Sequence, residues 1–251
     1  MTMRWKLFRP FVSFFLLALA VVGNPLVALS ADGKIHLISA ENPGGLLEIK
    51  NDDVVGAYPT FFGEASNRSG VSIDYRIVPW MRAVKETEHS DNLLLFPFTR
   101  NEERENRFNW ITPLKDEPIC FSSVNAGVDT LEDARKLKRV LVWRGSSHES
   151  FLEKNGFGNL ITVANVDKVI QILKASPDAA WFSACDQLHF LFDQESYGIS
   201  AKVGTPVTNE AIWLVSGKSL VPKPELNKFV QAIDTLRKKK FLEKLLNEVA
   251  K

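Results

Sequence analysis

The sequence has 251 residues, 45% of them hydrophobic, and its 31 Lys and Arg against 30 Asp and Glu give a formal charge of +1. This balance offers no electrostatic reason to expect a nucleic acid partner. The length suits one large domain or two lobes of ordinary size. The four histidines are scattered without the spacing of a metal site, so neither a metal nor another cofactor is predicted.

The first thirty residues have the pattern of a secretory signal peptide. Basic residues near the N-terminus precede an apolar run from Phe11 to Val22, which ends at Asn24-Pro25. We predict cleavage after Ser30, because Ala28 and Ser30 are the small residues that such a site requires. The apolar run is shorter than the roughly 20 residues that span a bilayer, which disfavours an uncleaved anchor. The prediction is therefore a periplasmic protein whose formal charge after cleavage is about −2.

Apolar extended runs alternate with helical runs along the rest of the chain, which predicts an α/β protein with parallel sheets. The first predicted elements are strand 35–40, helix 58–67, strand 71–78, helix 80–87, strand 93–96 and a helical or turn segment at 104–107. The later ones are extended segment 119–124, helix 131–137, strand 140–143, a helix from 151 to about 155, helix 166–175, strand 179–182, helix 186–192, extended segment 207–215 and one or two helices within 225–249.

This order of elements predicts two lobes. The first lobe comprises 31–117 plus 210–251 and the second 118–209, so that extended segments near 118–122 and 206–210 cross between them. A paired crossing forms a hinge, and hinge closure around a ligand is a recurrent device. In open α/β sheets the ligand lies at the carboxyl ends of strands, near helix N-termini.

The run from Phe98 to Pro113 resembles the middle of the family 3 extracellular solute-binding proteins, the periplasmic components of polar amino acid ABC importers. Segments 78–83, 142–147 and 176–180 agree with that family in the same order, and the similarity extends over essentially the whole chain after residue 30. The resemblance implies a two-lobed, type II periplasmic-binding-protein-like fold. Each lobe would be a βα sheet sandwich, and a two-strand hinge would join the lobes.

Two candidate sites for a ligand carboxylate follow from the resemblance. Arg104 stands where the family places an Arg that forks onto the carboxylate, and a guanidinium suits a planar anion. In the family, the strand-to-helix junction at Gly145-Ser146-Ser147 completes that site, and a Ser N-cap at a helix N-terminus is a natural anion seat. The alternatives are a surface Arg104 paired with Glu103 or Glu105, and a plain helix cap.

This sequence departs from the family pattern at the position that would contact the ligand ammonium. The family carries an Asp where this chain has Ser183, and Asp186 lies three residues further on. Because Ser supplies no charge, a standard α-amino acid is disfavoured, while a carboxylate or another polar solute remains. Glu41 could meet a cationic ligand group or be a solvated loop residue. Trp80, whose helix also carries Arg82, is the preferred aromatic candidate, with core packing as its alternative.

The predicted function is binding of a small polar solute by hinge closure, for delivery to an ABC importer, by a monomer that is not an enzyme. Ser147 and His148 are neighbours in the sequence, which does not make a catalytic pair, and no Gly-x-Ser-x-Gly elbow occurs. The alternatives are a periplasmic sensor or adaptor that signals to a membrane receptor, and a small-molecule hydrolase. Cys120 and Cys185 could form a disulfide or remain two buried thiols.

Overall fold

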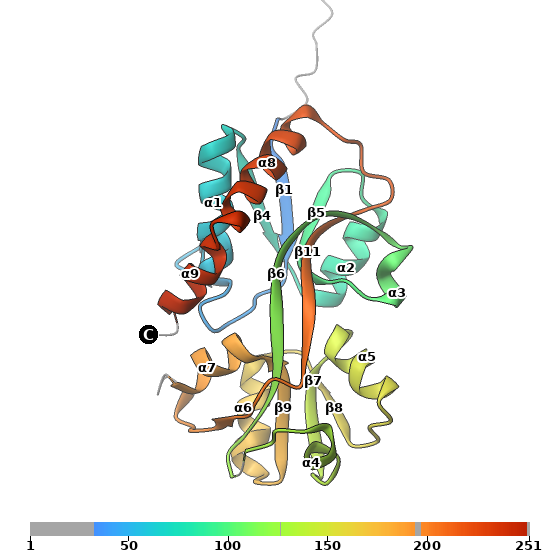
Figure 1. The fold of residues 1–251 in the computed structure, drawn as a ribbon, viewed down its shortest axis with the longest axis vertical. Coiled ribbons are helices and arrows are strands. Elements are labelled where there is room, and N and C mark those ends of the chain that lie inside the picture. Colours follow the sequence, from blue (N-terminus) through green and yellow to red (C-terminus); the bar gives the residue numbers. More distant parts are fainter. Residues whose placement is uncertain (1–32, 126, 194–196, 250–251) are drawn as a thin grey trace, which may run out of the picture. The chain divides into compact units, whose positions relative to one another are not determined.

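The structure is a computed structural model that describes residues 33–125, 127–193 and 197–249 (Figure 1). The predicted signal peptide, residues 1–30, lies outside the described residues. No helix within the described part of the chain combines the length and the apolar character that crossing a membrane requires.

A mixed sheet runs through the described chain in the strand order β4-β1-β5-β11-β6-β9-β7-β8, with β10 paired to β6. Its strands are β1 (Ile35–Ser39), β4 (Ile73–Ile77), β5 (Leu93–Thr99), β6 (Phe108–Ser123), β7 (Arg139–Trp143), β8 (Leu160–Val163), β9 (Ala179–Ala184), β10 (Lys202–Val203) and β11 (Thr208–Gly217). A separate hairpin pairs β2 (Glu48–Lys50) with β3 (Asp53–Val55).

The long strands β6 and β11 connect two groups of parallel strands. Strands β4, β1 and β5 are parallel to one another, as are β9, β7 and β8. Between these groups β6 and β11 pair antiparallel, and each is also antiparallel to its outer neighbour, β9 or β5. The parallel strands were predicted, whereas the antiparallel ribbon of β6 and β11 was read only as two extended crossings.

Helices cover both faces of the sheet in each half of the molecule (Figure 1). They are α1 (Ala57–Ser69), α2 (Trp80–His89), α3 (Glu102–Glu105), α4 (Leu131–Arg135), α5 (Ser147–Lys154), α6 (Val166–Ala175), α7 (Cys185–Asp193), α8 (Pro224–Lys238) and α9 (Phe241–Val249). Helix α5 begins at Ser147, four residues before the amphipathic run predicted from Phe151, and the side chain of Ser146 caps it by accepting from the Glu149 amide, in agreement with the Ser N-cap considered at Gly145-Ser146-Ser147. Strand β8 was not predicted.

The apolar cores divide in the way that a two-lobed protein requires. In the first half, Phe62 of α1 and Phe229 of α8 belong to one cluster with Phe96 of β5 and residues of α9, while Phe98 belongs to a second cluster with residues of α2. In the second half, one cluster contains residues of α6 and α7 and another contains residues of α4 and α5 around Phe182. The two-lobed α/β prediction is confirmed. The boundaries at 117/118 and 209/210 stay a prediction.

Cys120 and Cys185 form a disulfide, which decides between the two alternatives left open by the sequence. The bond ties β6 to the first residue of α7, and the two Cα atoms lie 5.0 Å apart. The segment that it closes is long, because 65 positions separate the two cysteines. The start of α7, including Asp186, is thereby fixed against the crossing strand.

Reduction of this disulfide should lower the free energy of unfolding by about 2–4 kcal/mol, because an unfolded chain without the cross-link gains conformational freedom. Urea unfolding with and without a reductant measures the change. The double variant Cys120→Ala/Cys185→Ala should match the reduced protein and should not respond to the reductant. Equal stability of the oxidised and reduced protein would contradict the prediction.

Candidate functional site

The ribbon of β6 and β11 carries three charged side chains into the interior. Lys115 and Glu117 lie on β6 and Glu210 on β11, and each of these residues is buried. In the ribbon Glu210 stands opposite Glu117, and Lys115 stands opposite Ile212. Burying a charge is unfavourable unless partners surround it, so the contacts of these groups define the site.

The Glu210 carboxylate joins residues from both halves of the molecule. Its Oε2 atom accepts from the Thr99 hydroxyl at 2.7 Å and from the Ser147 hydroxyl at 2.8 Å, and it lies 3.5 Å from Nε2 of His148. Thr99 ends β5 in the first half, whereas Ser147 and His148 begin α5 in the second. One carboxylate oxygen therefore links the two halves directly.

The charges of Glu210 and His148 stabilise each other. Burial by itself would raise the pKa of Glu210, but the His148 charge and the three hydrogen bonds lower that pKa to about 2. Burial would lower the pKa of His148, but Glu210 outweighs it and the pKa is raised. Two further charged groups act on this imidazole: Glu117 raises its pKa and Arg104 lowers it.

Arg104 is a buried cation that lacks a carboxylate partner among the described residues. Its guanidinium donates to the backbone oxygens of Thr99 at 3.1 Å and Gly145 at 3.4 Å, and its Cζ atom lies 4.2 Å from the centre of the Phe98 ring. Only 7% of the residue is exposed, and this burial lowers its pKa to about 10 despite the opposing effect of Glu210. At neutral pH the side chain is therefore charged and not neutralised by an ion pair.

The acidic neighbours of Arg104 in the sequence have other partners. Glu103 pairs with Lys154 at 3.0 Å, and Glu105 pairs with Arg100 at 2.6 Å. The alternative in which Arg104 pairs with one of them at the surface therefore does not describe this structure. The Asn101 side chain caps α3 by accepting from the Arg104 amide, which fixes the backbone from which the guanidinium projects.

Lys115 forms the centre of a second charged group. Its ammonium lies 2.8 Å from Asp186 Oδ2 and 3.2 Å from Glu117 Oε1, and only 2% of its side chain is exposed. Burial would lower its pKa, but Glu117, Tyr58 and Asp186 outweigh burial and raise that pKa. Nearby, the buried Tyr58 hydroxyl has no hydrogen-bond partner among the described residues.

Together these groups form what we call the charged belt. Glu117 connects its two ends, because it contacts Lys115 on one side and influences His148 on the other. The belt is composed of Arg104, Lys115, Glu117, His148, Asp186 and Glu210.

The structure brings some of the predicted site residues together at this belt. Ser147 contacts Glu210, and Ser146 caps the same helix. The Trp80 indole donates from Nε1 to the Gly145 oxygen at 3.1 Å, the same oxygen that accepts from Arg104. Gly145 itself has a positive φ of 69°, and a side chain there would collide with Met81. The turn before α5 thus lies directly against α2 and α3.

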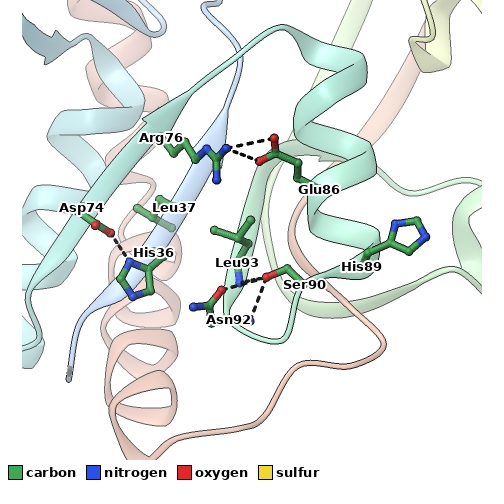
Figure 2. Close-up of a pocket in the computed structure, with 9 residues that line it drawn as sticks. All are labelled: His36, Leu37, Asp74, Arg76, Glu86, His89, Ser90, Asn92 and Leu93. Atoms are coloured by element: carbon green, nitrogen blue, oxygen red, sulfur yellow. Dashed lines mark hydrogen bonds and ion pairs between the residues drawn. The ribbon is translucent and has the colours of Figure 1, made fainter. Parts of the chain in front are cut away.

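Other predicted residues lie elsewhere. Arg82 is exposed and pairs with Glu86 at 2.6 Å, and Glu86 lines a separate hollow together with Arg76 (Figure 2). Glu41 is exposed and accepts a hydrogen bond from the Ile49 amide. Ser183 is buried and donates to Gln187 Oε1 at 2.7 Å.

Gln187 connects Ser183 to the other half of the molecule, because its Nε2 atom donates to the Pro43 oxygen at 3.0 Å. The hydroxyl of Ser183 is therefore already engaged within the protein.

Sequence reasoning missed most of the belt. The sequence pattern assigns no role to Glu117 or Glu210, marks His148 only as the neighbour of Ser147, and leaves Lys115 between the elements predicted at 104–107 and 119–124. A signal was present, since charged residues interrupt two otherwise apolar extended runs. A charge at an inward position of a strand is unfavourable without partners, which marks it as a candidate.

Solved structures of known proteins match this chain, whereas comparison by sequence gives no match. No protein-family model matches the sequence, and no curated protein matches it. Among solved structures, a histidine kinase sensor domain with similarity to periplasmic binding proteins matches 86% of this chain and 95% of its own, with a TM-score of 0.74 and 14% identity.

Amino acid-binding proteins give comparable structural matches. An ancestral arginine-binding protein bound to glutamine matches 86% of this chain and 97% of its own, with a TM-score of 0.73 and 17% identity. The substrate-binding protein AbpA of an amino acid ABC transporter from Streptococcus pneumoniae, bound to L-arginine, covers 87% and 94% with a TM-score of 0.72 and 14% identity. The chain has the two-lobed fold of the periplasmic binding proteins. The TM-scores and coverages establish the fold, which confirms the fold that the sequence resemblance implied.

Replacing Glu210 by Gln should lower the free energy of unfolding by about 2 kcal/mol, because the amide keeps an acceptor for the hydroxyls but loses the charge that balances His148. Urea unfolding at neutral pH measures the loss. Asp116→Asn is the matched control, since Asp116 is exposed on β6, the strand that pairs with β11. Equal effects of the two substitutions would contradict the assigned role of Glu210.

Stability should also depend on pH through His148. Its folded pKa is raised, so its contribution is complete below its ordinary pKa of about 6.5 and is lost as the pH rises through the higher folded value. The Glu210 contribution is instead lost as the pH falls from about 4.5 toward about 2. Unfolding free energies of the wild type and of His148→Gln, measured from pH 6 to pH 9, should converge at the alkaline end. A constant difference would contradict the prediction.

Proposed function

We propose that this protein binds a small solute carrying an acidic group between its two lobes, and that Arg104 holds that group. The observation that supports the proposal is the buried guanidinium, whose partners among the described residues are two backbone oxygens and an aromatic ring. An uncompensated buried cation is unfavourable, and an anion placed beside it would remove the penalty. Arg is also the side chain best suited to a planar anion.

The neighbouring turn supplies further support. Ser146 and Ser147 begin α5, and the positive end of this helix faces the region of Arg104, since the Gly145 oxygen accepts from that guanidinium. Arg104 projects from the first half and α5 from the second. A solute that contacts both would favour the closed arrangement by the difference in its affinity for the closed and open forms.

We propose that the partner of the closed form is an ABC importer, to which it delivers the solute. Support comes from the fold, which this chain shares with the substrate-binding protein of an amino acid ABC transporter. We further propose that the protein is a periplasmic monomer, with the pattern in residues 1–30 as the support for export.

A sensor function is the second candidate. The observation that favours it is the match to a histidine kinase sensor domain with a TM-score of 0.74. The lobes would bind a solute in the same way, and the closed form would contact a membrane receptor. Neighbouring genes for a permease and an ATPase would favour the importer, whereas a neighbouring receptor gene would favour the sensor.

The arrangement of Ser147 and His148 gives little support to a hydrolase. A serine nucleophile needs a base that removes its proton, usually an imidazole at hydrogen-bond distance. Here the Ser147 hydroxyl bonds to Glu210 and Thr99, while His148 also lies against Glu210. We therefore propose a binding protein and no catalytic step.

Replacing Arg104 by Met should weaken binding of an acidic solute by about 100-fold, because the solute would lose a desolvated charge partner. The probes are L-glutamate, L-glutamine and L-arginine together with glutarate and succinate, screened by thermal shift and then titrated by calorimetry. Arg100→Met is the matched control, because Arg100 lies on the same segment and pairs with Glu105 at the surface.

The stability of the variants separates binding from a structural role. Since Arg104 has no carboxylate partner among the described residues, Arg104→Met should change the unfolding free energy of the solute-free protein by less than about 1 kcal/mol. Unchanged affinity in this variant would remove Arg104 from the site. A large loss of stability would indicate that the residue is structural.

A further inference from the structure

The carboxylates of the belt all have a cationic neighbour, whereas one of its cations has no carboxylate neighbour. Glu117 and Asp186 both lie within ion-pair distance of Lys115, and Glu210 lies 3.5 Å from His148. Each carboxylate of the belt thus has a cationic group of the protein beside it. Arg104 is the exception on the positive side, since no carboxylate among the described residues lies within ion-pair distance of it.

Lys115 is held firmly in its position. Its side chain is almost fully buried and extends from the part of β6 that pairs with β11. Its ammonium reaches Asp186 at the start of α7, which the Cys120–Cys185 disulfide ties to the same strand. The protein therefore places an ammonium of its own between the two carboxylates that could otherwise receive one from a solute.

Ser183 lies near the end of β9, three residues before Asp186 in the chain, and it carries no charge. Its hydroxyl donates to Gln187, so it offers no negative charge to a cation. A solute ammonium brought to Glu117 or Asp186 would meet the buried Lys115 ammonium, and like charges at close range repel each other.

Two buried polar atoms, one in the belt and one that interacts electrostatically with it, have no hydrogen-bond partner among the described residues and are suited to donate. The Tyr58 hydroxyl and Nδ1 of His148 are buried without hydrogen-bond partners among the described residues. The raised pKa of Tyr58 keeps its proton in place, and the raised pKa of His148 favours the form in which both ring nitrogens are donors. Groups of this kind fit a solute that is rich in acceptors.

Building on the proposed function, we infer that the solute is an organic anion without an ammonium group, and that Lys115 is the residue that excludes amino acids. The solute's acidic group meets Arg104, and the Lys115 ammonium takes the place of a solute amine. This differs from the glutamine and L-arginine bound by the two structurally similar proteins described above.

The test compares acids that differ only in the α-ammonium group, each titrated into the wild-type protein by calorimetry. The matched pairs are glutarate with L-glutamate, succinate with L-aspartate, glutaramate with L-glutamine, and 3-phenylpropionate with L-phenylalanine. In every pair that binds, the acid without the amine should bind at least about tenfold more tightly, because a buried ammonium beside Lys115 would be repelled.

The variant Lys115→Met assigns the preference to this residue. It keeps the length of the side chain and frees Glu117 and Asp186, so the ratio of the two affinities should shift toward the amino acid by at least about tenfold. Lys138→Met is the matched control, because Lys138 pairs with Asp178 in an exposed ion pair. The wild-type comparison decides the solute class even where Lys115→Met fails to fold.

The outcomes separate this inference from the proposed function. Tighter or equal binding of the amino acids by the wild type would overturn the inference and leave the proposed function intact. A preference for the amine-free acids that persists unchanged in a folded Lys115→Met protein would overturn the role of Lys115. No binding of any acid in the pairs would contradict the proposed function, and the inference would fall with it.

Discussion

The arrangement of this molecule depends on placing charged side chains inside an antiparallel ribbon that both halves share. Strands β6 and β11 are hydrogen-bonded over most of their length, so the positions of Lys115, Glu117 and Glu210 are set by strand register. Each of these charges is buried and would be unfavourable without partners. Their partners come from both halves, and the halves are therefore coupled through electrostatic contacts at the ribbon as well as through the chain itself.

This coupling explains why local features of the sequence have consequences across the molecule. The cap of α5 at Ser146 sets where the helix begins, and that start brings Ser147 and His148 to Glu210. The left-handed turn at Gly145 allows its carbonyl oxygen to accept from both Trp80 and Arg104. A small change at this turn would alter contacts to α2, α3 and β11 together, because all of them meet within one short segment.

The sequence predicted the two-lobed α/β fold well because alternating periodicity reports strands and helices directly. Helix α6 and strand β7 are good examples, since their apolar residues follow a simple pattern. The site was predicted less completely. The resemblance led to Arg104 and Ser147 as candidates, and both lie at the charged belt, whereas Glu210 and Lys115 were missed because their partners lie far away in the chain. A buried ion pair depends on tertiary neighbours, and no local periodicity encodes them.

The position of Lys115 gives a physical account of the departure seen in the sequence. At the position where the sequence resemblance leads us to expect an acidic residue for a solute ammonium, this chain has Ser183, which is buried and bonded to Gln187. Lys115 meanwhile supplies a permanent internal ammonium to Asp186 and Glu117. Ser183 and Lys115 both disfavour a solute ammonium. Ser183 supplies no negative charge, and Lys115 supplies a fixed positive one. Arg104, which has no carboxylate partner among the described residues, adds a further positive charge, and these three features together are the support for the proposal that the solute is an anion and not a zwitterion.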